Sequence, residues 1–256
     1  FSPIYKIDWL EMQSNPHHQD KEIVDYWAKA ATPSGKARLQ FRVKSKRLVW
    51  HAVLAVSHGL KRVIDIVASG CALVLLSPVY AVTALLIVLE DRGPIFFKQE
   101  RIGYRGQSFY MWKFRSMVTN ADALKDQLLS QNEHSGNTVT FKMKRDPRIT
   151  RVGRFIRKYS IDELPQFWNV FKGEMSIVGP RPCVPREVVM YTVEDRKRLL
   201  AKPGLTCFWQ VAGRADINFA GQVRLDVEYI RSESVWLDIK LLLMTVPAVL
   251  LGKGAY

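Results

Sequence analysis

A long apolar run interrupted by one proline constrains the fold of this chain more than any other feature. The 27 residues from Val63 to Leu89 contain a single charged residue, Asp65. As one straight helix the run would be about 40 Å long, which is enough to cross a bilayer core of roughly 30 Å. Pro78 lies near its middle, where it removes a backbone donor and clashes with the preceding turn. We therefore expect the helix to bend there.

Two arrangements of this run remain open, a kinked transmembrane helix and a re-entrant hairpin that enters and leaves on one face. Basic residues flank both ends, with Lys61 and Arg62 before the run and Arg92 after it. Because basic flanks tend to stay on the cytoplasmic side, the charges favour the re-entrant hairpin. Asp65 is expected near the interface, paired with Arg62, rather than at the bilayer centre.

Two further segments are typical of helices that lie at a membrane surface. Residues 48–56 are apolar and follow a basic stretch, and residues 235–251 are apolar but interrupted by Asp238, Lys240 and Pro247. The second segment is at the lower limit for a span, so we expect an interfacial helix with Trp236 at headgroup level. A helix buried in the protein core is the alternative. Residues 1–46 are polar, and since the chain starts at Phe1 we expect sequence upstream.

The charge balance predicts an anionic partner. The formal net charge is +14, and residues 101–158 alone hold 13 Lys or Arg against four Asp or Glu, a net of +9. Nucleic acid, anionic lipid and a phosphate-bearing substrate all fit this charge. The apolar run weighs against nucleic acid. Three cysteines with no C-x-x-C spacing argue against a disulfide framework or a zinc site and suggest reduced thiols, as in the cytoplasm.

The part from residue 90 to 234 is soluble in character. Short strands are expected at 96–97 and 109–112, with a turn at Gly103 and Gly106 between them. Helices are expected at 120–131 and 163–171. The sequence thus predicts an α+β fold that is predominantly helical.

An adjacent pair of carboxylates, Asp162-Glu163, is the best candidate for chemistry. The chain lacks the sequence signatures of nucleotide-binding P-loops, dinucleotide-binding folds, zinc proteases and serine hydrolases. Ser160-Ile-Asp-Glu163 matches a capping box, in which Glu163 would only return a hydrogen bond to a helix start. With Arg157 nearby, however, a carboxylate at a helix N-terminus stays ionised and can attack phosphorus.

Basic residues around the pair suit phosphate oxygens. Gly179-Pro180-Arg181-Pro182 is a rigid turn that would fix the direction of one guanidinium, and a plain surface turn is the alternative. A diphosphate held between basic groups, with a divalent ion on adjacent carboxylates, is a common arrangement for phosphoryl transfer. Mg²⁺ is the ion that oxygen-only ligands favour.

A series of short motifs in a fixed order resembles the bacterial sugar transferases called monotopic phosphoglycosyl transferases, over roughly residues 60–255. The motifs are Lys61-Arg62-x-x-Asp65, Ser77-Pro78, Gly93-Pro94-x-x-Phe97-x-Gln99-x-Arg101-x-Gly103, Lys113-Phe114-Arg115-Ser116-Met117, Asp162-Glu163-Leu164-Pro165-Gln166, Asn169-Val170-x-x-Gly173-x-Met175-Ser176, Val178-Gly179-Pro180-Arg181-Pro182 and Lys202-Pro203-Gly204-Leu205-Thr206. The end of the chain resembles the longer members, which act on galactose or glucose phosphate in O-antigen, capsule or exopolysaccharide synthesis.

The resemblance implies a fold, an activity and a site. The fold would be a re-entrant membrane helix-break-helix at 63–89, with interfacial amphipathic helices, around a small mixed cytoplasmic catalytic domain at 60–256; residues 1–59 would be the remnant of an upstream region. Asp162 would attack the β-phosphate of a UDP-hexose and release UMP, and polyprenyl (undecaprenyl) phosphate would then take the sugar phosphate. Glu163, with Asp162, would hold Mg²⁺. The residues implied in binding phosphates or nucleotide are Arg157, Arg181, Arg214, Lys113 and Arg115.

The same resemblance places the protein in the bacterial inner membrane with its catalytic part facing the cytoplasm. A membrane-anchored scaffold or anionic-lipid-binding protein without catalysis is the alternative, as is direct attack by the lipid phosphate without a covalent enzyme. No nucleic-acid partner is expected. The hexose, the polysaccharide and the oligomeric state, a homo-oligomer included, stay open.

Overall fold

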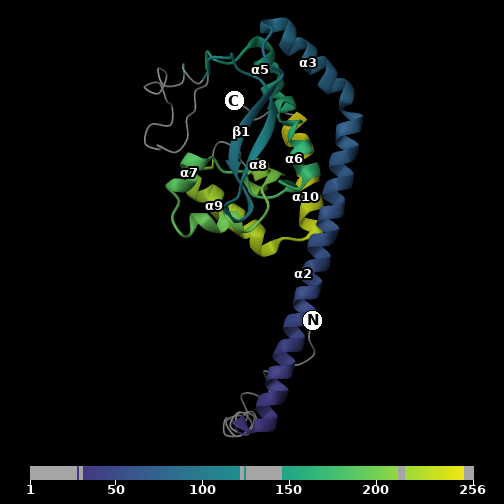
Figure 1. Cartoon of the computed structure of the whole chain (residues 1–256), viewed down its shortest axis with the longest axis vertical. Coiled ribbons are helices and arrows are strands. Elements are labelled where there is room, and N and C mark those ends of the chain that lie inside the picture. The colour runs from purple at the N-terminus through teal and green to yellow at the C-terminus, as the bar shows by residue number, and fades with distance from the viewer. Residues whose placement is uncertain (1–27, 29–30, 122–123, 125–145, 213–216, 251–256) are drawn as a thin grey trace. The chain divides into compact units, whose positions relative to one another are not determined.

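The computed structural model describes residues 28, 31–121, 124, 146–212 and 217–250. Within these ranges the chain is mostly helical, with two small two-stranded sheets, which confirms the predicted α+β class (Figure 1). The elements in chain order are α2 (Pro33–Leu75), α3 (Ser77–Asp91), β1 (Phe96–Ile102), the 3₁₀ turn η1 (Tyr104–Gly106), β2 (Ser108–Phe114), α5 (Arg151–Lys158), the 3₁₀ turn η3 (Ile161–Glu163), α6 (Gln166–Lys172), β3 (Ser176–Val178), α7 (Pro185–Val189), the 3₁₀ turn η4 (Asp195–Leu200), β4 (Gly204–Thr206), α8 (Phe208–Ala212), α9 (Phe219–Ser232) and α10 (Val235–Leu250).

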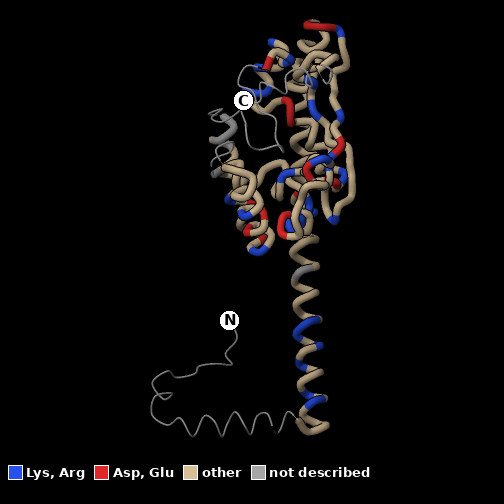
Figure 2. The backbone as a smooth tube through the Cα atoms, turned by 90° about the vertical axis from the view of Figure 1, so that its left-hand side faces the viewer, with Lys and Arg blue, Asp and Glu red and all other residues tan. Residues whose placement is uncertain are grey.

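The chain divides into two units, residues 1–58 and 59–256. In the first unit the described residues are almost all helical and belong to the first half of α2. Figure 2 shows Lys and Arg gathered along this half. The predicted surface helix at residues 48–56 is therefore helical, as part of α2. All features below belong to the second unit.

The predicted bend in the apolar run is present. Helix α2 ends at Leu75 and α3 begins at Ser77, with the two axes 57° apart. Pro78 lies in the first turn of α3, where a backbone N–H would have no acceptor within the helix, so its absence costs no hydrogen bond. Among the described residues, no single helix is long and apolar enough to cross a membrane, whereas this bent pair is, by length and composition.

Lys61, just before the apolar run, fixes that run to the rest of the unit. Its ammonium donates hydrogen bonds to the carbonyl of Val178 (3.1 Å) and the hydroxyl of Tyr229 (3.0 Å) and pairs with Asp238. Because these partners come from β3, α9 and α10, the bonds hold one end of the apolar run against three distant segments.

The predicted Arg62–Asp65 pair is wrong. Arg62 instead donates to the carbonyls of Val170 and Phe171, both at 2.7 Å, at the end of α6. Asp65 is 4% exposed, and its carboxylate accepts bonds from the Ser176 hydroxyl and the Ile177 amide. Asp65 thus accepts hydrogen bonds from two buried polar groups of β3, a contact that sequence spacing could not reveal.

The predicted strands form one antiparallel hairpin, β1 with β2, and they are longer than the sequence suggested. The second sheet, β3 with β4, is parallel and fully buried on β3. Asn169 of α6 lies against the hairpin edge, accepting a bond from the Trp112 amide and donating to the Tyr110 carbonyl. This contact places α6 beside β2 (Figure 1).

The main core brings together β2, α6, β3, α9 and α10. Its buried members are Met111, Val170, Met175, Ile177, Val178, Tyr229 and Leu241. Helix α10 therefore buries one face in the core while Trp236 and Leu243 stay exposed. The prediction of a buried helix is therefore correct for one face of α10. The placement of its other face at a membrane surface stays a prediction.

Candidate active site

The hairpin supplies the first cations of the site. In β2, side chains alternate between two faces, so Met111 and Lys113 point to the same side. Their partners in the antiparallel register are Gln99 and Phe97 of β1. Arg101, two residues further along β1, lies on this side as well. The hairpin thus carries both cations on one face, Lys113 near η3 and Arg101 near the Pro182 carbonyl.

The carboxylate pair lies on a short 3₁₀ turn, not at an α-helix start. Ser160 precedes the turn in a left-handed conformation (φ 55°) and makes no side-chain cap. Helix α6 begins only at Gln166, after Pro165. The capping-box alternative is therefore wrong, and so is the predicted start of this helix at 163.

The carboxylate of Glu163 faces the hairpin. Its Oε1 accepts a hydrogen bond from Lys113 Nζ at 2.6 Å, and the two residues form an ion pair. The turn itself is supported from the apolar run, because the Tyr80 hydroxyl of α3 donates to the Leu164 carbonyl at 2.6 Å. The bent helix pair and the carboxylate pair are thus linked through one residue.

The two adjacent carboxylates have opposite pKa shifts. Burial raises the pKa of Asp162 to about 6, against the lowering effect of the Lys113 ammonium. Burial would also raise the pKa of Glu163, but the cations of Lys113 and Arg181 outweigh it and hold that pKa below its ordinary value. Neighbouring carboxylates with separated pKa values are a common property of catalytic sites.

Arg181 reaches the site from a turn that two glycines make possible. The Gly179 amide donates to Thr206 and the Gly204 amide to Pro180, so the two backbones touch. A Cβ on Gly204 would lie 2.1 Å from the Gly179 nitrogen. The guanidinium of Arg181 lies 5.7 Å from the ring centroid of the buried Trp209. The predicted rigid turn is therefore built by the parallel sheet beneath it.

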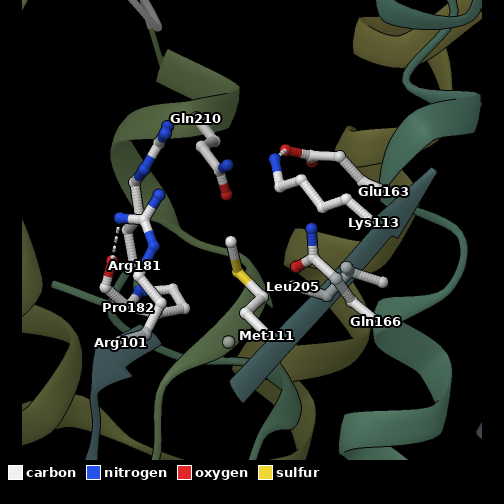
Figure 3. A pocket seen from close by; sticks show the side chains of 10 residues that line it. Arg101, Met111, Lys113, Glu163, Gln166, Arg181, Pro182, Leu205 and Gln210 are labelled. Atoms are coloured by element: carbon white, nitrogen blue, oxygen red, sulfur yellow. Dashed lines mark hydrogen bonds and ion pairs between the residues drawn. The ribbon is translucent and has the colours of Figure 1, made fainter. Parts of the chain in front are cut away.

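These elements enclose one pocket, seen from close by in Figure 3. Its lining residues are Arg101, Met111, Lys113, Glu163, Gln166, Arg181, Pro182, Gly204, Leu205 and Gln210. Three cations and one carboxylate leave a net charge of +2, which suits a diphosphate. Asp162 is 8% exposed and does not line the pocket, although its neighbour Glu163 does.

Of the other predicted phosphate-binding residues, Arg157 and Arg115 are described, and they lie in different places. Arg157, in the last turn of α5, is close enough to Asp162 to lower its pKa. Arg115 does not line the pocket, since its guanidinium pairs with Asp91 and donates to the Pro94 carbonyl at 2.6 Å. Arg214 lies outside the described residues.

Three polar residues of the pocket, Arg101, Gln166 and Gln210, received no role from the sequence. Arg101 is 7% exposed and donates to Pro182 and Gln99, and burial lowers its pKa to about 10, so it is charged at neutral pH. Gln166 and Gln210 complete the wall. Arg101 and Gln166 stand in the quoted motifs, but only the register of the hairpin and the position of α6 direct them into the pocket.

The residues present allow a magnesium ion only with help from a substrate. Among the described residues, no group of three or more His, Cys, Asp and Glu side chains could hold a metal. Mg²⁺ at phosphate sites commonly takes one or two carboxylates, the other ligands being water and phosphate. Asp162 and Glu163 would supply two such carboxylates, and a magnesium ion on them stays a prediction.

Fold and site together define a class of protein in which a bent apolar helix pair supports a pair of adjacent carboxylates, one of which lines a cation-rich pocket. Residues 56–252 match the model of the family described as bacterial sugar transferase, and the chain belongs to that family.

Three relatives show the extent of the similarity. Galactosyl transferase CpsE of Streptococcus agalactiae serotype III (strain NEM316) is 46% identical over 196 residues, which are 76% of this chain and 43% of that protein. Exopolysaccharide production protein ExoY of Rhizobium meliloti (strain 1021) is 39% identical over 207 residues, 80% of this chain and 92% of that protein. Undecaprenyl-phosphate galactose phosphotransferase of Salmonella typhimurium is 44% identical over 202 residues, which are 78% of this chain and 42% of that protein. The chain thus matches less than half of the length of the first and third.

Proposed function

We propose that this protein transfers a hexose 1-phosphate from a UDP-hexose to polyprenyl (undecaprenyl) phosphate and releases UMP. The step would begin the synthesis of a bacterial surface polysaccharide. The observation that carries the proposal is that Glu163, the residue next to Asp162, lines one pocket together with Lys113 and Arg181. The names of the relatives from Streptococcus and Salmonella, a galactosyl transferase and an undecaprenyl-phosphate galactose phosphotransferase, support the same chemistry.

The substrate's diphosphate would be held by the pocket cations. Arg181 and Arg101 offer guanidinium groups, which bind phosphate oxygens in pairs of hydrogen bonds, and Lys113 offers an ammonium. Lys113 is paired with Glu163 in the structure. An incoming diphosphate would compete for this ammonium and free the Glu163 carboxylate.

Asp162 would act as the nucleophile. An oxygen of its ionised carboxylate forms a bond to the β-phosphorus, and the bond from that phosphorus to the oxygen bridging it to the α-phosphate breaks. UMP leaves with the bridging oxygen and the electron pair. The sugar phosphate stays on Asp162 as an acyl phosphate until an oxygen of polyprenyl phosphate displaces the carboxylate. With a pKa of about 6, Asp162 is mostly ionised at neutral pH.

Since Asp162 is 8% exposed, this chemistry requires its carboxylate to become accessible when substrate binds. Its place beside Glu163, which does line the pocket, makes that movement short. Mg²⁺ held by Glu163 and Asp162 would neutralise charge on the diphosphate. Arg157 would keep Asp162 ionised between turnovers.

We place the protein in the bacterial inner membrane, with α2 and α3 forming a re-entrant hairpin and the pocket facing the cytoplasm. The link from Tyr80 to Leu164 supports this arrangement, because it would hold the carboxylate pair close to the membrane surface where the lipid phosphate lies. The nucleotide-sugar would reach the same pocket from the cytoplasm.

The test is UMP release across several UDP-hexoses with undecaprenyl phosphate. Wild-type protein should release UMP, and Asp162→Asn should not, while both remain folded. Incubation with UDP-sugar labelled in the sugar should leave label on Asp162 when the lipid acceptor is omitted. Unchanged UMP release in Asp162→Asn would refute the proposal, and turnover without a labelled enzyme would point to direct attack by the lipid phosphate. A folded protein with no turnover on any UDP-hexose would favour the scaffold alternative.

A further inference from the structure

A second, larger cavity lies on the other face of the hairpin. Because side chains alternate along a strand, Tyr110 and Trp112 of β2 point away from the face that carries Met111 and Lys113. Lys98 is the register partner of Trp112 and shares its face. The cavity has a volume of about 460 Å³, within the range of roughly 300–1,000 Å³ that is usual for ligand sites. Its lining residues are Lys98, Gly103, Tyr104, Gln107, Ser108, Phe109, Tyr110, Trp112, Lys172, Gly173, Glu174 and Lys202.

The lining combines lysines with aromatic rings. Lys98 places its ammonium 4.4 Å from the ring centroid of Trp112. Lys172 is paired with Glu174 at 2.7 Å. Within the described part of the chain, neither Lys98 nor Lys202 has a carboxylate within ion-pair distance. Three lysines against one glutamate leave a net charge of +2, so the cavity favours an anion.

The cavity also lies beside the start of the apolar run. Helix α6 ends at Lys172 and is capped by Gly173, and the carbonyls of the two residues before Lys172 accept hydrogen bonds from Arg62 of α2. Arg62 thereby offsets the partial negative charge that the end of a helix would otherwise present to an anion. The residue after Arg62, Val63, is the first of the apolar run.

We propose that this cavity binds the phosphate headgroup of an anionic membrane phospholipid. The proposal rests on the membrane placement of α2 and α3 in the proposed function, since that placement puts Arg62 and the neighbouring cavity at headgroup level. The ammonium groups of Lys98, Lys172 and Lys202 would take the phosphate, and the rings of Tyr110 and Trp112 would contact the apolar part of the lipid. Most of the strand residues of the cavity lie on the face of β2 opposite the active-site pocket, and the two share no lining residue, so the lipid would anchor and orient the β1–β2 hairpin without entering the reaction.

Lipid retention by the full chain tests the proposal. Protein in detergent is titrated with phosphatidylglycerol or phosphatidylcholine, and the bound lipids are counted by native mass spectrometry. Lys98→Gln with Lys202→Gln should weaken phosphatidylglycerol retention roughly tenfold and leave phosphatidylcholine retention unchanged. The matched control is Lys158→Gln with Lys240→Gln, which removes the same charge from two exposed positions outside the cavity. Lys158 also lies over an aromatic ring, that of Tyr159, as Lys98 does over Trp112. The control should bind as the wild type does.

Two outcomes would overturn the site. Equal weakening in both double variants, or in neither, would mean that only general surface charge attracts the lipid. Displacement of phosphatidylglycerol by inorganic phosphate or glycerol phosphate at comparable concentration would identify a site for a soluble phosphate instead. Measuring UMP release as well distinguishes failure of the lipid site from failure of the proposed function, because Asp162→Asn should lose turnover and still retain phosphatidylglycerol. If Asp162→Asn kept both turnover and phosphatidylglycerol retention, the proposed function would be refuted and the lipid site would not be.

Discussion

Replacing Asp162 by Asn should abolish turnover and at the same time stabilise the protein. Burial raises the pKa of Asp162 from 3.8 to about 6, so folding makes ionisation of this carboxyl group less favourable than it is in the unfolded chain. A tenfold change in an acid dissociation constant corresponds to about 1.4 kcal/mol, so a pKa raised by about two costs roughly 3 kcal/mol at neutral pH. Asn has the same shape and no charge, so it removes this cost.

The size of the stabilisation depends on pH. Because the folded pKa lies above the unfolded value, the contribution of Asp162 to stability is fully present below pH 3.8 and is lost as the pH rises through 6. The advantage of Asp162→Asn over the wild type should thus be greatest at pH 7 and above and nearly absent at pH 4. At about 2–4 °C per kcal/mol, the midpoint of thermal unfolding should rise by roughly 6–12 °C at pH 7.

Glu163→Gln provides the matched control, since it makes the same chemical change at the next residue. Lys113 and Arg181 hold the pKa of Glu163 below its ordinary value despite burial, so its charge stabilises the fold and its removal should lower the unfolding midpoint. Thermal unfolding of the three proteins in one detergent, at pH 7 and pH 4, measures both effects. A fall in midpoint for Asp162→Asn, or a rise that does not change with pH, would refute the reasoning.

Three further predictions follow from the same geometry. UMP release should fall about tenfold between pH 7 and pH 5, because the ionised fraction of a group with a pKa of about 6 falls by that factor; a flat pH profile would contradict Asp162 as the nucleophile. Gly204→Ala should lower both the unfolding midpoint and turnover, since its Cβ would meet the Gly179 backbone that leads to Arg181, while Gly59→Ala, with open space around it, should do neither. Arg115→Met should lower the unfolding midpoint because it breaks the ion pair with Asp91, and it should leave KM for the UDP-hexose unchanged. A raised KM in a variant of unchanged stability would show that Arg115 binds the substrate.

The local features of the chain could be predicted from its sequence. The bend near Pro78 follows from covalent chemistry, because proline has no N–H to donate and is tolerated best in the first turn of a helix. The hairpin follows from the aromatic runs that flank Gly103 and Gly106. Asp162-Glu163 can be predicted as the reactive pair because the signatures of the commoner enzyme classes are missing, which leaves the carboxylates beside several basic residues as the candidates for catalysis.

Which groups meet across long separations was decided only by the tertiary structure. Arg62 and Asp65 are neighbours on one helix face, yet each bonds to segments more than 100 residues away, because buried backbone groups there need partners. Lys113 and Arg115 have the same charge and lie two residues apart in the same motif. The Lys113 ammonium bonds to Glu163 in the pocket, whereas the Arg115 guanidinium is held by Asp91 at the end of α3. Sequence determined that cations would be plentiful here, and packing selected the ones that line the pocket.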